Sequence, residues 1–440
     1  MKALALLALA LLVSCAPKPQ TTRAALPAIE LPAMRTFAGP PDGMTRRSNA
    51  TLARDFLDLH FALESGRAVP RLTRFEGPVT LRLVNTSPAL AAEAERLTAR
   101  LREEAGIDIR IGREGERTIT VQALPGEAIR RVVPSAACFV APRISSWAEY
   151  HAARRTGATD WTTLDERTHV AIFVPADAAP QEQRDCLHEE VAQALGPLND
   201  LWHLTDSVFN DDNFHAVLTP FDMLVLRATY DPALSSGMAW AEVADALPTL
   251  LRRLNPRGGA VGSAGPTISN SWSRLMSAAL RPGAVGPRRA RAARAAEQAL
   301  RYPDARRAFA LYAYGRLSLS TDGAAALAAF LEASDIYERA GLDLQEAHVA
   351  LQLAAFSLSA GRAETAIAIA KEHAPVARAA QNAALLASFG LIEAEALDTL
   401  GRADEAEALR VDSLGWARYG FGSGAALQTR VAEIRGLRPF

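Results

Sequence analysis

The chain has 440 residues, of which 49% are hydrophobic and 22% are charged, and its formal net charge is −1. This composition is typical of a globular protein and excludes a disordered chain. The length predicts two domains with connecting segments. The near-neutral charge gives no general attraction to nucleic acid, so no nucleic-acid partner is expected.

The first residues have the pattern of an export signal. Residues 1–14 join a basic start to an apolar run that is too short for a mature transmembrane helix. The run ends in Leu-Val-Ser followed by Cys15, which resembles a bacterial lipobox. The resemblance implies lipidation of Cys15 and a lipoprotein that faces the periplasm, with Ala16 favouring the outer membrane. An ordinary signal peptide is the alternative. Residues 15–45, rich in Pro, Ala and Thr, are predicted to tether the lipid to the folded part.

Residues 46–254 show helix and strand periods in turn. We expect helices over 48–65, 88–105, 181–195 and 238–254, and strands over 79–85, 107–111, 118–123, 137–141 and 169–175. Residues 145–167 are predicted to be irregular, and Pro248 is predicted to interrupt the last helix. The order predicts an α+β domain with a mixed sheet, a backing helix and a second helix that carries polar residues. Periodicity alone also allows other α+β folds.

Cys138 and Cys186 are the only cysteines besides Cys15. In an oxidising envelope compartment, two such cysteines predict a disulfide between them. Two buried thiols are the alternative.

The composition changes after residue 254. Residues 255–287 are rich in Gly, Ser, Pro and Ala and are predicted to be a linker, whereas residues 288–440 are rich in Ala and Leu and are predicted to be all-helical. Segments that begin at Gly361 and Gly401 align at a spacing of 40 residues. Ala326, Phe330 and Ala333 match the second helix of a tetratricopeptide repeat. Three degenerate units of this kind are predicted, and the resemblance implies a protein partner. A plain helical bundle is the alternative.

The helix predicted over 181–195 carries a polar motif. Glu189 and Gln193 lie four residues apart and therefore share one helix face, and Gly196 and Asn199 follow. This spacing resembles the metzincin zinc-protease motif, with oxygen groups in place of the histidines. The resemblance places metal ligands at Glu189, Gln193 and Asn199 or Asp200. It makes Glu190 the general base.

A different register begins the motif at His188. It would put Ala192 at the second ligand position and no glycine at the turn, so the register of Glu189 and Gln193 is adopted. The oxygen-rich set favours a Ca-, Mg- or Mn-like ion over zinc.

The resemblance continues after the motif helix. Residues 218–230 resemble the helix that follows the Met-turn in matrixin-type metzincins, and Ser207, Val208 and Phe209 take the place of the Met-turn. Residues 46–245 as a whole also resemble a family of uncharacterised envelope proteins from proteobacteria. The resemblance to metzincins implies a zincin-like fold for this half of the chain.

Two functions remain open from the sequence. The first is an envelope lipoprotein whose metzincin-like domain is degenerate and non-catalytic, with its polar residues in an architectural network. Its helical domain would bind another protein. The second is a metal-dependent hydrolase that cuts peptide or cell-wall peptide bonds with Glu190 as general base.

Overall fold

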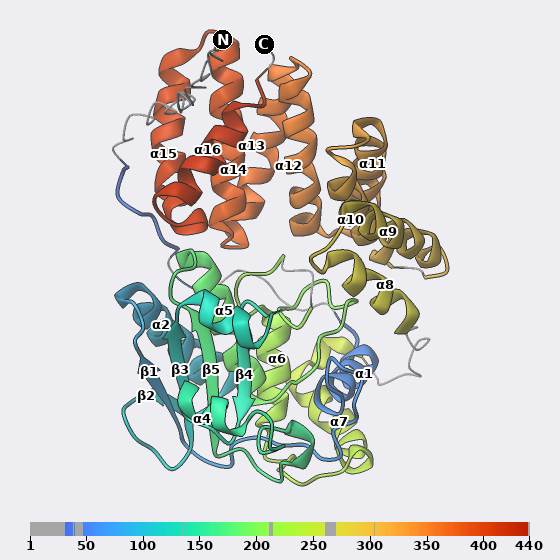
Figure 1. Ribbon diagram of the computed structural model, residues 1–440. Coiled ribbons are helices and arrows are strands. Elements are labelled where there is room, and N and C mark those ends of the chain that lie inside the picture. The colour runs from blue at the N-terminus through green and yellow to red at the C-terminus, as the bar shows by residue number, and fades with distance from the viewer. Residues whose placement is uncertain are drawn as a thin grey trace, which may run out of the picture.

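The computed structural model describes residues 31–37, 39, 47–134, 136–210, 214–259, 270–302 and 304–438. Figure 1 shows two parts, one built around a sheet and the other made of helices only. The predicted signal peptide, Cys15 and most of the predicted tether lie outside the described residues. Within the described ranges, no helix is long and apolar enough to cross a membrane.

The first part contains a five-stranded mixed sheet with the order β2-β1-β3-β5-β4. Strands β1, β2, β3 and β5 are parallel, and β4 pairs antiparallel with β5 at one edge. The central strands are buried on both faces, which explains why β5 is an almost continuous apolar run. The predicted α+β class with a mixed sheet is confirmed. The strands are β1 (Val79–Val84), β2 (Ile109–Ile111), β3 (Thr118–Leu124), β4 (Phe139–Pro142) and β5 (His169–Pro175).

Helices cover both faces of the sheet. The larger core joins one face to α1, α2, α5, α6 and α7, and a smaller core joins the other face to α3 and α4. The helices are α1 (Asn49–His60), α2 (Pro88–Ala105), α3 (Gly126–Val132), α4 (Trp147–Ala153), α5 (Pro180–Leu195), α6 (Pro220–Thr229) and α7 (Trp240–Leu254). Two short 3₁₀ turns are η1 (Trp161–Thr163) and η2 (Pro256–Gly258).

Several elements differ from the sequence prediction, among them α3, which was not predicted, and β2, which is two residues shorter than expected. Helix α1 ends at His60, five residues earlier than expected. Helix α4 lies in a stretch predicted to be irregular, where the Ser146 hydroxyl accepts a hydrogen bond from the Glu149 amide and caps the helix. Helix α7 continues through Pro248 because its leucines, among them Leu247 and Leu251, are buried and offset the lost backbone hydrogen bond.

The second part contains helices stacked as antiparallel neighbours, from α8 to α16 (Figure 1). Gly341, Gly361, Gln381 and Gly401 recur every twenty residues between helices, and each adopts a positive φ. The regular spacing of these turns shows that the region is helical and repeat-like. Two helices and their turns span 40 residues, which agrees with the predicted repeat length. The helices are α8 (Asn270–Leu280), α9 (Val285–Ala299), α10 (Arg306–Ser318), α11 (Gly323–Ala340), α12 (Asp343–Ser359), α13 (Ala363–Ala379), α14 (Ala383–Thr399), α15 (Ala403–Phe421) and α16 (Ala425–Arg435).

Helix α8 lies within the stretch predicted as a linker. Its Trp272 and Met276, four residues apart on one face, are fully buried in the core of the helical part. The Trp272 indole also donates a hydrogen bond to the Ala295 carbonyl, 3.1 Å away. Helical packing therefore begins before residue 288.

The first turns of α5 contact the helical part. The Gln181 side chain accepts a hydrogen bond from the Ala384 amide at 3.0 Å and donates one to Asn382 at 3.1 Å. Arg184 donates to the Gln381 carbonyl at 2.6 Å. The helix that carries the polar motif is therefore anchored at its N-terminal end to the helical part.

Residues 31–37, within the predicted tether, lie along α15 (Figure 1). The Arg35 amide donates to the Gly415 carbonyl at 3.0 Å, and Phe37 stacks on Trp416 with ring centroids 4.6 Å apart. This segment is thus held against the helical part rather than extending freely.

The predicted disulfide is confirmed. Cys138, next to β4, is bonded to Cys186 on α5, and their Cα atoms are 5.9 Å apart. The alternative of two buried thiols is therefore wrong. The bond ties the antiparallel edge of the sheet to the motif helix.

Candidate functional site

The predicted general base, Glu190, is a buried carboxyl group on α5. Its side chain is 5% exposed, and its Oε2 atom has no hydrogen-bond partner in the described part of the chain. Burial raises the pKa of Glu190 well above its ordinary range, and the charges of Glu189 and Glu64 raise it further. Glu190 therefore favours the protonated, neutral form in the folded protein.

The structure gives the contacts or burial of the other predicted ligand residues, Glu189, Gln193, Asn199 and Asp200. Asn199 donates its side-chain amide to the Asp58 carbonyl at 3.0 Å, which satisfies the last turn of α1. Gln193 is buried on α5, and Glu189 and Asp200 are partly buried. Among the described residues, no three His, Cys, Asp or Glu side chains are grouped as a metal ion would require. The predicted ligands Gln193 and Asn199 are amides and lie outside these residue types, so the ligand assignment stays a prediction.

Arg167 is the main polar partner of the C-terminal end of α5. The residue is 1% exposed, and its guanidinium group donates to the carbonyls of Gln193, Ala194 and Gly196 at 2.6, 2.8 and 2.6 Å. These carbonyls lie at or just beyond the last turn, where a helix leaves them without internal partners and carries a partial negative charge. Burial lowers the pKa of Arg167 to about 10, so it remains charged at neutral pH.

The turn glycine, Gly196, is required because neighbouring side chains approach it closely. A Cβ atom at this position would lie 2.8 Å from Thr229 Cγ2 and 3.1 Å from His60 Nε2. His60 is itself buried, with Nδ1 2.8 Å from the Phe56 carbonyl and Nε2 2.9 Å from the Thr229 hydroxyl. The glycine predicted for a sharp turn therefore allows α5, α1 and α6 to meet.

Gly196→Ala is expected to lower the free energy of unfolding by about 2 kcal/mol, because overpacking of a filled site costs about 1–3 kcal/mol. Chemical denaturation measures the loss. Thr229→Ser removes the Cγ2 atom that the new methyl group would strike. In the double variant the Gly196→Ala cost should fall by at least about half, as expected for coupled neighbours. A Gly196→Ala cost that is the same with and without Thr229→Ser would contradict the steric explanation.

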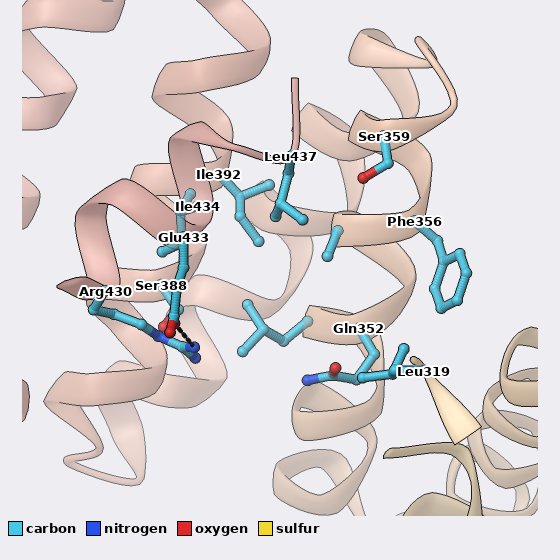
Figure 2. Close-up of a pocket in the computed structure, with 12 residues that line it drawn as sticks. Leu319, Gln352, Phe356, Ser359, Ser388, Ile392, Arg430, Glu433, Ile434 and Leu437 are labelled. Carbon is cyan, nitrogen blue, oxygen red and sulfur yellow. Dashed lines mark hydrogen bonds and ion pairs between the residues drawn. The ribbon is translucent and has the colours of Figure 1, made fainter. Parts of the chain in front are cut away.

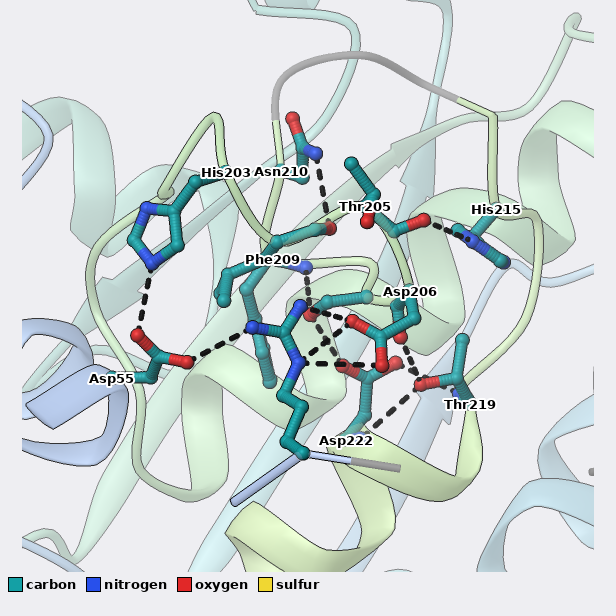
Figure 3. Close-up of polar contacts among 12 residues, drawn as sticks. Asp55, His203, Thr205, Asp206, Phe209, Asn210, His215, Thr219 and Asp222 are labelled. Atoms are coloured by element: carbon teal, nitrogen blue, oxygen red, sulfur yellow. Dashed lines mark hydrogen bonds and ion pairs between the residues drawn. The ribbon is translucent and has the colours of Figure 1, made fainter. Parts of the chain in front are cut away.

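The segment predicted as the Met-turn equivalent is fastened to α6 by one carboxylate. Asp222 accepts hydrogen bonds from the Ser207 hydroxyl, the Val208 amide at 3.2 Å and the Thr219 amide at 2.8 Å (Figure 3). Asp222 also completes a capping box with Thr219 at the start of α6. Phe209 is fully buried, and its carbonyl accepts from the Leu201 amide at 2.9 Å.

A charged network surrounds this turn. Arg47 bonds to Asp206, with Nε 2.9 Å from Oδ1, and to Asp55, with Nη1 3.0 Å from Oδ2 (Figure 3). His203 lies on the other side of Asp55, with its Nε2 2.9 Å from Oδ1. The fully buried Asp55 thereby links α1 to the loop that follows α5.

Three further hydrogen bonds define the faces of α5. His188 Nδ1 accepts from the Leu218 amide at 3.1 Å, so its Nε2 carries the proton and donates to Glu93 of α2, also at 3.1 Å. At the other end, the Tyr230 hydroxyl donates to the Leu195 carbonyl at 3.0 Å. His188 thus faces the backing helix.

Sequence reasoning missed Arg47, Asp55 and Arg167. Arg167 lies at the end of a polar stretch without a helix or strand period, and its partners are about thirty residues further along the chain. Arg47 and Asp55 are more than 140 residues from Asp206 and His203. No local sequence pattern indicated these pairs.

The fold and the site together define a mixed-sheet α+β domain with a buried polar motif, followed by a helical repeat-like region. Residues 49–249 match the model of a family described as "Protein of unknown function (DUF2927)", so the chain contains a domain of this uncharacterised family. No curated protein matches the chain.

Proposed function

We propose that this protein is a periplasm-facing envelope lipoprotein with a non-catalytic, metzincin-like domain and a tetratricopeptide-like region that binds another protein. The observation that carries the proposal is the burial of the loop after α5. In the motif that this helix resembles, the loop leads to the third metal ligand. Here Trp202 and Phe214 of that loop lie in the hydrophobic core of the helical part, with Phe309 5.5 and 5.7 Å from their rings.

Several features of the first part support a metzincin-like framework. The sheet is mixed, α2 backs the sheet, and α5 carries the motif. The contacts of Asp222 with Ser207 and Val208, and of Tyr230 with Leu195, give structural roles to residues that match the metzincin helix pattern. These contacts would stabilise the metzincin-like fold even if the domain binds no metal.

A metal-dependent hydrolase of peptide bonds is the second candidate. It is favoured by Glu190, whose Oε2 atom lacks a hydrogen-bond partner in the described part of the chain and whose pKa is raised by burial and then by Glu189. A carboxyl group whose pKa is raised holds its proton more tightly, as a proton-donating group in catalysis must.

A pocket in the helical part supports the proposal of a protein partner. A pocket of about 300 Å³ lies between α12, α14 and α16, and its walls are mainly apolar (Figure 2). Arg430 and Glu433 pair with each other beside it at 3.1 Å, so the pocket carries no net charge. It would therefore take apolar side chains from a partner segment. The lining residues are Leu319, Leu351, Gln352, Ala355, Phe356, Ser359, Ser388, Ile392, Arg430, Glu433, Ile434 and Leu437.

A photo-crosslinking amino acid at Gln352 tests partner binding in the producing cell. We expect one discrete adduct in the envelope fraction, and we expect Leu319→Glu to abolish it because a charge would enter an apolar pocket. The same crosslinker at Glu364, which is exposed and outside the pocket, is the matched control. Equal adducts from both positions, or none from Gln352, would contradict the proposal.

A further inference from the structure

Helices α8 and α9 form a strongly basic hairpin at one end of the helical part. Residues 270–302 contain seven arginines and one glutamate, a net charge of +6 in a chain whose total is −1. Figure 1 shows both helices at the end of the helical part that lies opposite α15. Such a concentration of one sign of charge creates a local positive field, although the whole chain is nearly neutral. The arginines are Arg274, Arg281, Arg288, Arg289, Arg291, Arg294 and Arg301.

The arginines of the hairpin have no carboxylate partners. None of the seven forms an ion pair with an aspartate or glutamate in the part of the chain that the structure describes. By contrast, Arg306 at the start of the next helix pairs with Asp304. Glu297, the one carboxylate in the hairpin sequence, is exposed. The positive charge of the hairpin is therefore left to attract an anionic surface.

Two of the arginines hold the hairpin in shape. Arg288 Nε donates to the Ala279 carbonyl at 2.8 Å, at the C-terminal end of α8. Arg289 donates to the Thr321 hydroxyl at 2.7 Å. The other five make no side-chain hydrogen bond with the described residues, and four of them are exposed. Their guanidinium groups are therefore available to bind an anion from outside the chain.

The turn between the two helices adds an exposed apolar surface. Every residue from 280 to 287 is exposed, and Leu280 and Val285 are 38% and 41% exposed. Arg281 lies between them in the sequence, and Arg288 follows. Apolar side chains flanked by basic ones are typical of segments that lie in a membrane interface. There the apolar groups reach the acyl boundary while the charged heads stay among the lipid headgroups.

We propose that the α8–α9 hairpin docks on the surface of an anionic phospholipid bilayer. The available guanidinium groups would bind lipid phosphates, which match the fork of donors on arginine. Leu280 and Val285 would enter the interface between headgroups and acyl chains. This inference requires neither the lipidation of Cys15 nor the protein partner of the proposed function.

The side chains of the hairpin favour a bilayer over nucleic acid. Proteins that bind single strands use aromatic side chains on which the bases stack. Of the two aromatic residues in the hairpin, Trp272 is fully buried, and the guanidinium carbon of Arg306 lies 3.9 Å from the ring centre of Tyr302. The exposed aliphatic side chains of the turn suit acyl chains instead.

Co-sedimentation with lipid vesicles tests the proposal. The protein would begin at Ala16, so that neither the export signal nor a lipid anchor contributes to binding. The probes are vesicles of phosphatidylcholine, vesicles of phosphatidylcholine and phosphatidylglycerol in equal parts, and single-stranded and duplex oligonucleotides. We expect binding to the vesicles with phosphatidylglycerol only. It should weaken at least about tenfold between about 0.05 M and about 0.5 M salt, because salt screens exposed charges.

Paired charge variants locate the surface. Arg281→Gln with Arg294→Gln should weaken binding to the anionic vesicles at least about tenfold, since each basic residue near such a surface contributes about fivefold. The matched control is Arg110→Gln with Arg131→Gln, which removes the same charge from exposed positions in the first part of the chain. Its affinity should stay within about threefold of the wild type.

Apolar variants separate a bilayer from other anionic partners. Leu280→Ser with Val285→Ser keeps the charge and should weaken vesicle binding at least about threefold, because less apolar area leaves water. The matched control is Leu331→Ser with Val411→Ser, at positions 54% and 47% exposed on α11 and α15, and should bind as the wild type does. Circular dichroism confirms that each variant is folded.

Four outcomes would overturn the inference. They are no binding to the anionic vesicles at low salt, equal binding to vesicles of phosphatidylcholine alone, and equal losses in the hairpin and control arginine pairs. The fourth is oligonucleotide binding that is tighter than vesicle binding and survives the apolar substitutions, which would make the hairpin a nucleic-acid surface.

Discussion

Arg167→Met is expected to lower the free energy of unfolding by about 3 kcal/mol. The methionine side chain can fill much of the space but donates no hydrogen bond. The carbonyls of Gln193, Ala194 and Gly196 would then lose their buried donor, and each such group costs about 1–3 kcal/mol. The substitution also removes the desolvation penalty of a buried guanidinium group, which offsets part of the lost free energy. Urea denaturation followed by circular dichroism measures the change.

The matched control is Arg110→Met. Arg110 is 75% exposed and pairs only with Asp108 within the described residues, so its loss should change stability by less than about 0.5 kcal/mol. Equal effects of the two substitutions would contradict the role of Arg167 as the cap of α5. An Arg167→Met variant as stable as the wild type would also contradict this role.

Asp222→Ala is expected to lower the free energy of unfolding by about 4 kcal/mol at pH 5. The substitution removes a capping box, worth about 1 kcal/mol, and leaves the Ser207 hydroxyl and the Val208 amide without their buried acceptor. The turn in the Met-turn position should lose its anchor to α6. Denaturation measures the loss, with the exposed Asp245→Ala as the control, which should be neutral within about 0.5 kcal/mol.

The effect of Asp222→Ala should also depend on pH. Burial raises the pKa of Asp222 from 3.8 to about 6, against the lowering effect of its hydrogen bonds. Because the folded protein holds this proton more tightly than the unfolded chain, the wild type gains stability as the pH falls from about 6 towards 4. The alanine variant lacks this gain. The difference between the two proteins should therefore be about 1 kcal/mol larger at pH 5 than at pH 8. A difference that grows as the pH rises would contradict this assignment.

Elements with complete local signals were predictable from the sequence. Helix α2 has the predicted bounds because Ser87 caps it, Pro88 starts it, and Gly106 ends it with a φ of 72°. Strand β5 also has the predicted bounds, since its apolar run lies between polar segments. The disulfide followed from the count of cysteines and the expected compartment.

The polar site was only partly predictable. Gly196 and Asp222 were recognised through a resemblance, but their physical roles depend on Thr229, His60 and Ser207, which tertiary packing brings to them. The role of Gln381 was also not predictable from the sequence. This residue takes the place of a glycine in the helical repeat. Its φ is 55°, and its side chain donates to the Gly39 carbonyl. Contacts over such separations leave no periodic pattern in a single sequence.

The metal content of the full chain tests the central claim most directly. The protein would be purified without chelators and analysed by mass spectrometry for divalent metals, and its thermal unfolding would be followed with and without EDTA. A non-catalytic framework predicts far less than one equivalent of metal and an unchanged melting temperature. One equivalent of a divalent metal, lost in a folded Glu189→Ala, Gln193→Ala double variant, would contradict the claim and favour the hydrolase.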